Sequence, residues 1–563
     1  MVKAMHARRL DPAQARRFLE ARQLLSAGRI DQALGLAEAL VAQAPDAADA
    51  WQLLGICQAE AHCRSQAIAA FERAMALLPG ETTVARNFAV FLSREGNALC
   101  AHAQWQEAEP LLRRAVALQP GQASAWVDLG LAVRHLGRVD EALVALRQAE
   151  RLLQRGGHRS SALQDAINGV LADAGCSEQA LAGARELVSR DPAYAPAHET
   201  LGQLLWENRA GLSPGEDPFD EFRAAARAQP GNWPLQLALA RMLMSANRPE
   251  EVLALLHPLR RNDPGDPVLE WYAADALDAL EQHAQAAQLY ARVARSEQGD
   301  TPAFLNAHAR HAFRTQRFDL AQHCAQRCVQ LDPRDQQGWA NLGTAWCLLD
   351  DEREHWLFDY ERLVASIEVG IPEGFGDRQA FLQALGATLE SMHGASREPI
   401  NQSVRGGTQT AGRLFGRDNA LLRATETALR TAIEAWLATL PDDANHPFLA
   451  RRNRSVAFVG SWSVRLSSAG HHANHIHGDG WASSAFHVWL PPSVSESDDE
   501  SRAGWIQCGQ PPDELGLNLA PRRVLKPRAG WLVLFPSFIW HGTVPFQAST
   551  PRLTIAVDMQ PGK

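Results

Sequence analysis

The sequence predicts a two-part chain: an all-α solenoid of helical hairpins first, then an antiparallel β jelly roll with flanking helices. Proline and Leu-Gly pairs recur at similar intervals through the first 350 positions. From about residue 453, short segments rich in β-branched and aromatic residues follow one another, separated by Gly, Pro, Ser and Asp. At 563 residues the chain is also too long for one hydrophobic core. These observations predict two domains of different class.

Repeated positions mark the helical part. Prolines recur 34 residues apart, from Pro45 to Pro79 and from Pro230 to Pro264. The motif W-x-x-L-G begins at Trp51, Trp126 and Trp339, and a version that lacks the tryptophan begins at His198. The pattern resembles the tetratricopeptide repeat, a helix–turn–helix unit of 34 residues. Because one hairpin cannot bury its apolar face alone, the repeats are expected to stack into a solenoid over residues 1–350. The resemblance implies a concave groove that binds a protein or peptide.

The rest of the chain is predicted to hold a helical connector at 351–397 and a β domain at 398–563. Leu382, Leu385 and Leu389 follow helical spacing, and 420–437 is also expected to be helical, whereas 394–417 shows no period. The segments predicted as strands are 455–459, 462–466, 485–490, 504–508, 531–535 and 553–558. Together with the histidine cluster at 475–477 and the segment before His541, they make seven or eight short strands. Such a number favours a sandwich or jelly-roll barrel.

Charge, hydropathy and cysteine content indicate which classes of partner and which cellular compartment to expect. The formal net charge of −9 and a pI near 6.1 argue against nucleic acid or an anionic membrane as the main partner. We expect no transmembrane helix, because no run of about eighteen apolar residues occurs. Eight cysteines without a CxxC pair fit a reducing compartment, which predicts a cytoplasmic protein.

The candidate chemistry lies in the last ninety residues. His475, His477 and Asp479 alternate along the chain, so on a strand their side chains would share one face. His541 follows 64 residues after His477 and is expected at the end of an adjacent strand. Two imidazoles and one carboxylate are the ligand set of a non-haem Fe(II) oxygenase, which favours His477, Asp479 and His541 as metal ligands and catalytic residues. In a second register His475 replaces Asp479, which would then orient one imidazole.

Arginines supply two candidate anion sites. Arg552 lies eleven residues past His541, and Thr554 is expected on the same strand face. A guanidinium binds a carboxylate through two parallel hydrogen bonds, so this pair is predicted to bind a dicarboxylate cosubstrate, 2-oxoglutarate. Arg405-Gly406-Gly407 is either a second anion site, where backbone amides beside glycines cradle a negative group, or an ordinary turn.

Several stretches together carry a family resemblance. They are 401–410, 475–484, 527–537, 540–545 and 552–558. Over about residues 398–560 the chain resembles the 2-oxoglutarate/Fe(II)-dependent oxygenases that occur fused to tetratricopeptide repeats in bacteria. The resemblance implies a double-stranded β-helix fold, Fe(II), 2-oxoglutarate and dioxygen, and hydroxylation with release of succinate and carbon dioxide.

The chain departs from the family pattern at two places. The family's H-x-H motif falls on His475 and His477, with Gly478 where a proline is usual, and this keeps the three-histidine register open. Phe486-His487 stands where two aromatic residues are expected, one of them a tyrosine able to bond the cosubstrate. These departures leave the cosubstrate contacts beyond Arg552 open.

The leading hypothesis is an Fe(II)/2-oxoglutarate-dependent dioxygenase, a hydroxylase whose repeats recruit a protein or peptide substrate. One alternative is a tetratricopeptide-repeat scaffold with a catalytically inactive β-helix module. Another is a cupin-like metalloenzyme that does not use 2-oxoglutarate, which the three-histidine register suits.

Overall fold

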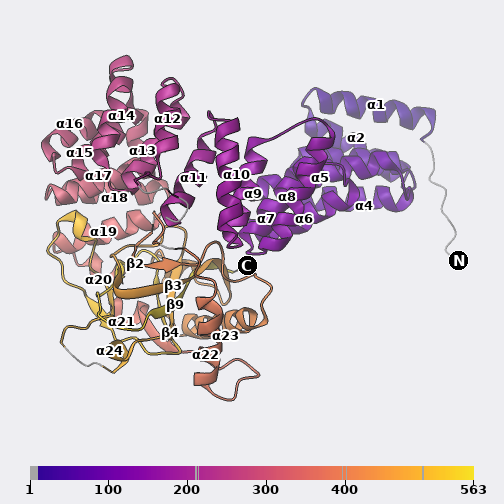
Figure 1. Cartoon of the computed structure of the whole chain (residues 1–563). Coiled ribbons are helices and arrows are strands. Elements are labelled where there is room, and N and C mark those ends of the chain that lie inside the picture. The colour runs from indigo at the N-terminus through magenta and orange to yellow at the C-terminus, as the bar shows by residue number, and fades with distance from the viewer. Residues whose placement is uncertain are drawn as a thin grey trace. The chain divides into compact units, whose positions relative to one another are not determined.

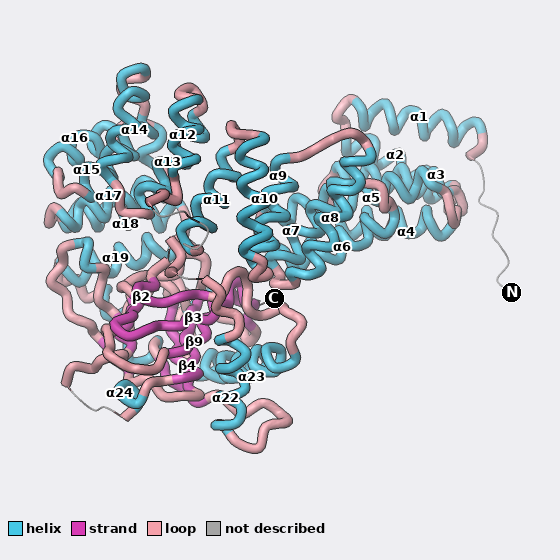
Figure 2. The backbone as a smooth tube through the Cα atoms, in the orientation of Figure 1, coloured by secondary structure: helices cyan, strands magenta, loops and turns pink. Residues whose placement is uncertain are grey.

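The computed structural model of the chain describes residues 10–208, 212, 215–395, 397–400, 402–496 and 500–562. Asn401, where one of the family-like stretches begins, lies outside these residues. Helices make up the first part of the chain, as Figure 2 shows, and the strands in the described ranges all follow residue 364. The chain divides into two compact units, Met1–Ile167 and Asn168–Lys563. The second unit therefore holds the later helices together with every described strand. The predicted domain boundaries near residues 350 and 398 stay predictions.

The first unit is built from antiparallel helical hairpins (Figure 1). Its helices are α1 Pro12–Ser26, α2 Ile30–Gln43, α3 Ala48–Glu60, α4 Arg64–Leu77, α5 Thr82–Ala101, α6 Trp105–Leu118, α7 Ala123–His135 and α8 Val139–Arg155, followed by α9 Ser161–Asp173, which runs across the boundary between the units.

The same hairpins continue in the second unit. Its helices up to residue 348 are α10 Ser177–Arg190, α11 Ala195–Glu207, α12 Asp220–Ala228, α13 Trp233–Ser245, α14 Pro249–Asn262, α15 Pro267–Ala279, α16 His283–Val293, α17 Pro302–Arg314, α18 Phe318–Leu331 and α19 Gln336–Leu348, with a 3₁₀ turn, η2 Glu297–Asp300, before α17. The predicted helical solenoid is thereby confirmed.

The W-x-x-L-G motif has a structural role at both of its ends. Each tryptophan Nε1 donates to a proline carbonyl six residues earlier: Trp51 to Pro45 at 2.8 Å, Trp126 to Pro120 at 2.9 Å and Trp339 to Pro333 at 3.0 Å. His198 takes the same position, with Nε2 3.1 Å from the Pro192 oxygen. A Cβ on Gly130 would lie only 2.6 Å from the Leu146 side chain, so the glycine lets the two helices of the hairpin touch. The motif thus joins neighbouring helices of the repeat.

The remaining elements form two antiparallel sheets with flanking helices. The larger sheet has the order β1-β7-β4-β9-β3-β2 and the smaller has the order β6-β5-β8. The strands are β1 Ala365–Glu368, β2 Val404–Gln409, β3 Val456–His472, β4 Ala482–Trp489, β5 Ile506–Cys508, β6 Arg523–Leu525, β7 Trp531–Pro536, β8 His541–Thr543 and β9 Arg552–Pro561. The helices are α20 Arg353–Leu357, α21 Tyr360–Leu363, α22 Arg378–Glu390, α23 Ala420–Thr439 and α24 Pro492–Ser495, with 3₁₀ turns η3 Leu449–Arg451 and η4 Asp513–Leu515.

Three expectations about these elements are corrected. The two segments predicted as strands at 455–459 and 462–466 form one continuous strand, β3. Its pairing with β9 shifts register at a bulge beside the glycine between the two segments and then continues. Strand β2 crosses the segment that showed no period, since its ladder with β3 supplies the order that its own residues do not. His541 begins strand β8 instead of ending a strand.

The last hairpin of the solenoid shares a hydrophobic core with the sheets. Leu342 and Trp346 of α19 belong to the same buried cluster as Phe538 and Trp540. The indole of Trp540 also donates to Thr344 Oγ1 at 2.9 Å, and both groups are buried. Because Trp540 precedes His541, this contact ties the end of the solenoid to a predicted site residue.

Two further expectations concern the chain as a whole. None of the helices in the described ranges is both long and apolar enough to span a bilayer. All eight cysteines have free thiols, among them Cys324 and Cys328 in the buried face of α18. A cytoplasmic location stays a prediction.

Candidate metal centre

Backbone hydrogen bonds bring three histidines to one point between the two sheets. His475 and His541 exchange both of their backbone hydrogen bonds, at 2.9 and 3.0 Å, in an isolated antiparallel bridge. The amide of His477 donates to the carbonyl of Ser537 at 3.1 Å, four residues before His541. Two chain segments that are 64 residues apart are thereby held side by side. Strand pairing therefore fixes the backbone positions from which the three imidazoles project.

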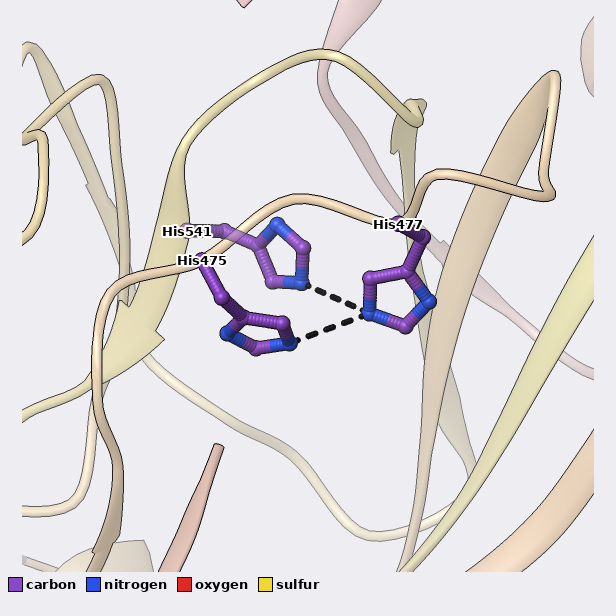
Figure 3. Close-up of side chains that lie close together, drawn as sticks. All are labelled: His475, His477 and His541. Carbon is purple, nitrogen blue, oxygen red and sulfur yellow. Dashed lines mark hydrogen bonds between the residues drawn. The ribbon is translucent and has the colours of Figure 1, made fainter. Parts of the chain in front are cut away.

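The three imidazoles point their Nε2 atoms at one another (Figure 3). Nε2 of His477 lies 3.1 Å from Nε2 of His475 and 3.2 Å from Nε2 of His541. The Nδ1 atoms face outward to oxygen acceptors: Ala473 O at 2.8 Å from His475, Asp558 Oδ1 at 2.6 Å from His477 and Ile539 O at 2.9 Å from His541. Each ring thus has one nitrogen turned to the protein and one to the shared centre.

This orientation suits a bound cation. An oxygen acceptor at Nδ1 requires the proton there, which leaves a lone pair on each Nε2. Burial lowers the pKa of His475 and of His541 well below the usual histidine value, so these rings stay neutral. Three lone pairs facing one another repel, unless a metal ion accepts them. With a metal–nitrogen distance of about 2.1 Å, adjacent ligands lie about 3.0–3.4 Å apart, which agrees with the two observed separations.

Asp479 lies outside this group. Its side chain is exposed, and its backbone carbonyl accepts a hydrogen bond from Gln560 at 2.7 Å. The expectation of a regular strand through His475, His477 and Asp479 is wrong, because β3 ends at His472 and the chain then turns irregularly. Without a strand, the two-residue alternation no longer carries Asp479 to the side of His477.

Asp558 is the carboxylate that sequence reasoning missed. It lies on β9, and its Oδ1 accepts from Ser483 Oγ at 2.6 Å as well as from His477. Ser483 is itself 2.8 Å from the hydroxyl of Ser537. Such a carboxylate holds the imidazole in the tautomer that a metal needs. A signal for Asp558 was present in the sequence, since it follows Arg552 and Thr554 at even spacing along one predicted strand.

Arg552 is buried beside this centre and is not paired with a carboxylate among the described residues. Only 2% of it is exposed. Its Nη1 donates to the carbonyl of Gly504 at 2.5 Å, its Nη2 lies 3.5 Å from His487 Nδ1, and its Nε has no hydrogen-bond partner within the described ranges. Burial lowers the pKa of Arg552 to about 10. A guanidinium in this position favours an anionic ligand, because a buried charge is costly without a counter-ion.

His487 stands next to Arg552, where the family pattern suggests a tyrosine. Burial and the nearby arginine lower the pKa of His487 well below the usual value, so the ring is neutral. Its Nε2 is buried, and none of the residues that the structure describes forms a hydrogen bond with it. The neutral His487 ring is therefore a buried neighbour of the Arg552 guanidinium.

One cavity of about 320 Å³ connects these groups. Its lining includes His475, His477, His541, Arg552, Thr554 and Trp462. The larger sheet contributes lining residues from β2, β3, β4, β7 and β9, and the smaller sheet contributes lining residues from β5 and β8. The volume is in the range of small-molecule sites.

Two family matches agree with this geometry. Residues 460–558 match a family described as "Putative 2OG-Fe(II) oxygenase", and residues 18–82 and 93–156 match the tetratricopeptide repeat. The chain carries tetratricopeptide repeats and a 2OG-Fe(II) oxygenase-family domain. The match to this oxygenase domain contains His475, His477, His541, Arg552 and Asp558, and the predicted resemblance is confirmed.

Three solved structures also match part of the chain. A MamA double mutant is 17% identical, with 33% of this chain and 98% of that chain covered and a TM-score of 0.27. MamA from Desulfovibrio magneticus RS-1 is also 17% identical over 33% of this chain and 98% of its own, with a TM-score of 0.26. The tetratricopeptide domain of P58(IPK) is 14% identical over 61% and 99%, with a TM-score of 0.21.

Proposed function

We propose that this protein is an Fe(II)/2-oxoglutarate-dependent dioxygenase, a hydroxylase whose repeats recruit a protein or peptide substrate. The observation that carries the proposal is the convergence of three imidazole Nε2 atoms beside a buried arginine that has no carboxylate partner in the described ranges. The oxygenase-family match over 460–558 supports it.

The proposed metal ligands are His475, His477 and His541. This is the register that the sequence left open, and we favour it because all three Nε2 atoms converge while the Asp479 side chain is exposed. Asp558 would keep the proton of His477 on Nδ1, so that its Nε2 stays available. Fe(II), when bound with 2-oxoglutarate and dioxygen, supplies the oxidation that hydroxylates a substrate C–H bond.

Arg552 and Thr554 are the proposed cosubstrate residues. Both are buried, both line the cavity, and both lie on β9 at even spacing, so their side chains share one face of the sheet. The free Nε of Arg552 offers a charge-assisted hydrogen bond to a carboxylate. Their position inside the fold keeps that bond away from bulk water, which strengthens it.

Anaerobic titration with Fe(II) and then 2-oxoglutarate tests the proposal. We expect a weak visible charge-transfer band in the native protein and none in His541→Ala. Arg423→Gln, an exposed arginine on α23, serves as a control and should keep the band. Absence of binding by both Fe(II) and 2-oxoglutarate in the native protein would disprove the function.

A second candidate follows from the ligand set itself. Three imidazoles without a carboxylate also suit a cupin-like metalloenzyme that does not use 2-oxoglutarate. Arg552→Gln separates the two candidates. In the dioxygenase this change should weaken 2-oxoglutarate binding by about 100-fold while the metal affinity is retained. Unchanged activity and cosubstrate affinity in Arg552→Gln would favour the cupin-like enzyme.

A further inference from the structure

A second cavity adjoins the candidate metal centre on its solenoid side. Its volume is about 400 Å³, and it shares Gln402, Ser403, His475 and Ile476 with the first cavity. Ser403 Oγ lies 3.2 Å from His475 Nε2, so the shared wall reaches the point where the three imidazoles meet. A ligand in the second cavity would therefore lie next to the metal centre.

Arginines from two directions line this second cavity. Arg310 and Arg314 stand one turn apart on α17, in the solenoid, and Arg405 stands on β2, in the larger sheet. All three belong to the same compact unit. Glu514 is the one carboxylate among the described residues that line the cavity. Because Arg314 is paired with the buried Asp278, the guanidinium groups of Arg310 and Arg405 remain against Glu514 in the described lining. This surplus of positive charge favours an anionic ligand.

Arg314 on α17 is held in place from behind. Arg314 Nη1 donates to the buried Asp278 at 2.6 Å, and its Nε donates to the carbonyl of Glu514 at 2.9 Å. Burial raises the pKa of the Asp275 carboxyl, and the positive charge of Arg310 partly opposes this rise. The Arg310 guanidinium therefore lies near that buried carboxyl. Arginines ordered in advance lose less entropy when they bind a ligand.

Arg405 Nη1 donates to two neutral groups, the carbonyl of Gln402 at 2.7 Å and the carbonyl of Val404 at 2.9 Å. The pairing of β2 with β3 shifts register between Arg405 and Gly407, with Gly406 at φ +64°. A Cβ on Gly407 would lie 2.6 Å from a backbone oxygen, so the glycines are needed for this bulge. Bulges turn side chains out of the regular strand pattern. The two glycines therefore have a structural role, and Arg405 supplies the charge.

We propose that this arginine-lined cavity binds an acidic peptide segment and presents a neighbouring residue of that segment to the metal centre. The inference rests on the proposed function and names its substrate class. A peptide is favoured over a small anion because the cavity is lined in part by solenoid helices and shares a wall with the cavity at the metal centre. The amides of Gln337 and Gln402 in its lining suit a peptide main chain.

Binding of a labelled peptide to the full-length protein tests the inference. The probe is a fluorescein-labelled ten-residue peptide with four aspartates, compared by anisotropy with the same peptide carrying four asparagines. We expect the aspartate peptide to bind more tightly, with an affinity that falls as salt rises. Equal binding of the two peptides would overturn the proposal, as would displacement by inorganic phosphate at the concentration where the peptide itself binds.

Paired variants locate the binding surface. Arg310→Gln with Arg405→Gln should weaken the aspartate peptide by at least about tenfold, because two charge-assisted contacts are lost. Arg314 is left unchanged, since it also neutralises the buried Asp278. The control, Arg362→Gln with Arg423→Gln, removes the same charge from exposed positions and should bind as the native protein does. Equal effects of the two pairs would show that net charge alone is responsible and would overturn the site.

The metal titration keeps this inference separate from the proposed function. Arg310→Gln with Arg405→Gln should retain the Fe(II)/2-oxoglutarate band, and His541→Ala should lose the band but still bind the aspartate peptide. A native protein without the band that still binds the peptide through Arg310 and Arg405 would contradict the dioxygenase function and leave an acidic-peptide site. A protein with the band but without the peptide preference would contradict only the present inference.

Discussion

Two groups of three potential metal ligands occur in the described parts of the chain, and they differ in where their protons point. One group is His475, His477 and His541, and the other is Asp278, His283 and His311. In the first, each Nδ1 faces an acceptor outside the group and each Nε2 faces its centre. In the second, the Nδ1 atoms of His283 and His311 lie 2.8 and 2.7 Å from one oxygen of Asp278.

The second group already contains its own cation. Arg314 donates to the other oxygen of Asp278 at 2.6 Å, and the side chain of Asp278 is fully buried. A metal ion there would have to displace a guanidinium and two ring protons. In the oxygenase-family domain the Nε2 lone pairs of the three histidines face one another. Similar residue types thus give two different results. In α15–α17, donors surround the Asp278 carboxylate and form an internal hydrogen-bonded network. Between the sheets, three Nε2 acceptors face one another and form a candidate metal centre.

Removing a proposed ligand should have the largest effect. His541→Ala should weaken Fe(II) binding by at least about 100-fold, because two imidazoles are left to hold the ion. Isothermal titration with Fe(II) under anaerobic conditions measures the loss. His283→Ala, from the other group, is the matched control and should bind Fe(II) as the native protein does. Equal losses in the two variants would remove the distinction between the groups.

Asp278→Asn should destabilise the fold by about 3 kcal/mol while Fe(II) binding is retained, because the buried network loses the carboxylate that accepts from His283, His311 and Arg314. Urea unfolding followed by tryptophan fluorescence measures the change. Burial raises the pKa of Asp278, but hydrogen bonds from His311, Arg314 and His283 outweigh burial and bring it below the ordinary 3.8. The stability that this carboxylate adds is therefore present above pH 3.8 and is lost as the pH falls below it. A difference from the native protein that stays constant below pH 3.8 would contradict this account.

Asp558→Asn should weaken metal binding by about 10- to 100-fold, since His477 loses the carboxylate that fixes its tautomer. The Fe(II) dissociation constant and its dependence on pH provide the measurement. Asp443→Asn, whose carboxylate lies at the surface, is the control and should change neither. A native-like dissociation constant in Asp558→Asn would show that the three histidines are oriented by their backbones alone.

Asp479→Asn should have the smallest effect, within about twofold on Fe(II) affinity, because the side chain is exposed and outside the group. The same titration decides between the two registers read from the sequence. A loss comparable to that of His541→Ala would instead restore Asp479 as a ligand and displace His475 from the set.

How well each element could be predicted from the sequence depends on how far apart in the chain its stabilising contacts lie. Helical repeats depend on contacts within about one or two hairpins, so the recurring Trp, Leu-Gly and Pro positions were sufficient to predict the solenoid. Strands β4, β7 and β9 were found from their own β-branched runs. Strand β2 was missed because its order comes from its ladder with β3, sixty residues away. Asp479 was favoured over His475 on the assumption of a regular strand, which ends at His472.

By itself, the sequence determined the two-part architecture, the oxygenase-family resemblance, and a short set of candidate residues that includes His475, His477 and His541. Local periodicity and motif chemistry carry that information. Only the tertiary structure decided how the candidates combine: that His475 pairs with His541 through a backbone bridge, that Asp558 orients His477, and that Arg405 shares a cavity with two arginines of the solenoid. The physical reason is that hydrogen-bond direction and cavity lining depend on residues far apart in the chain.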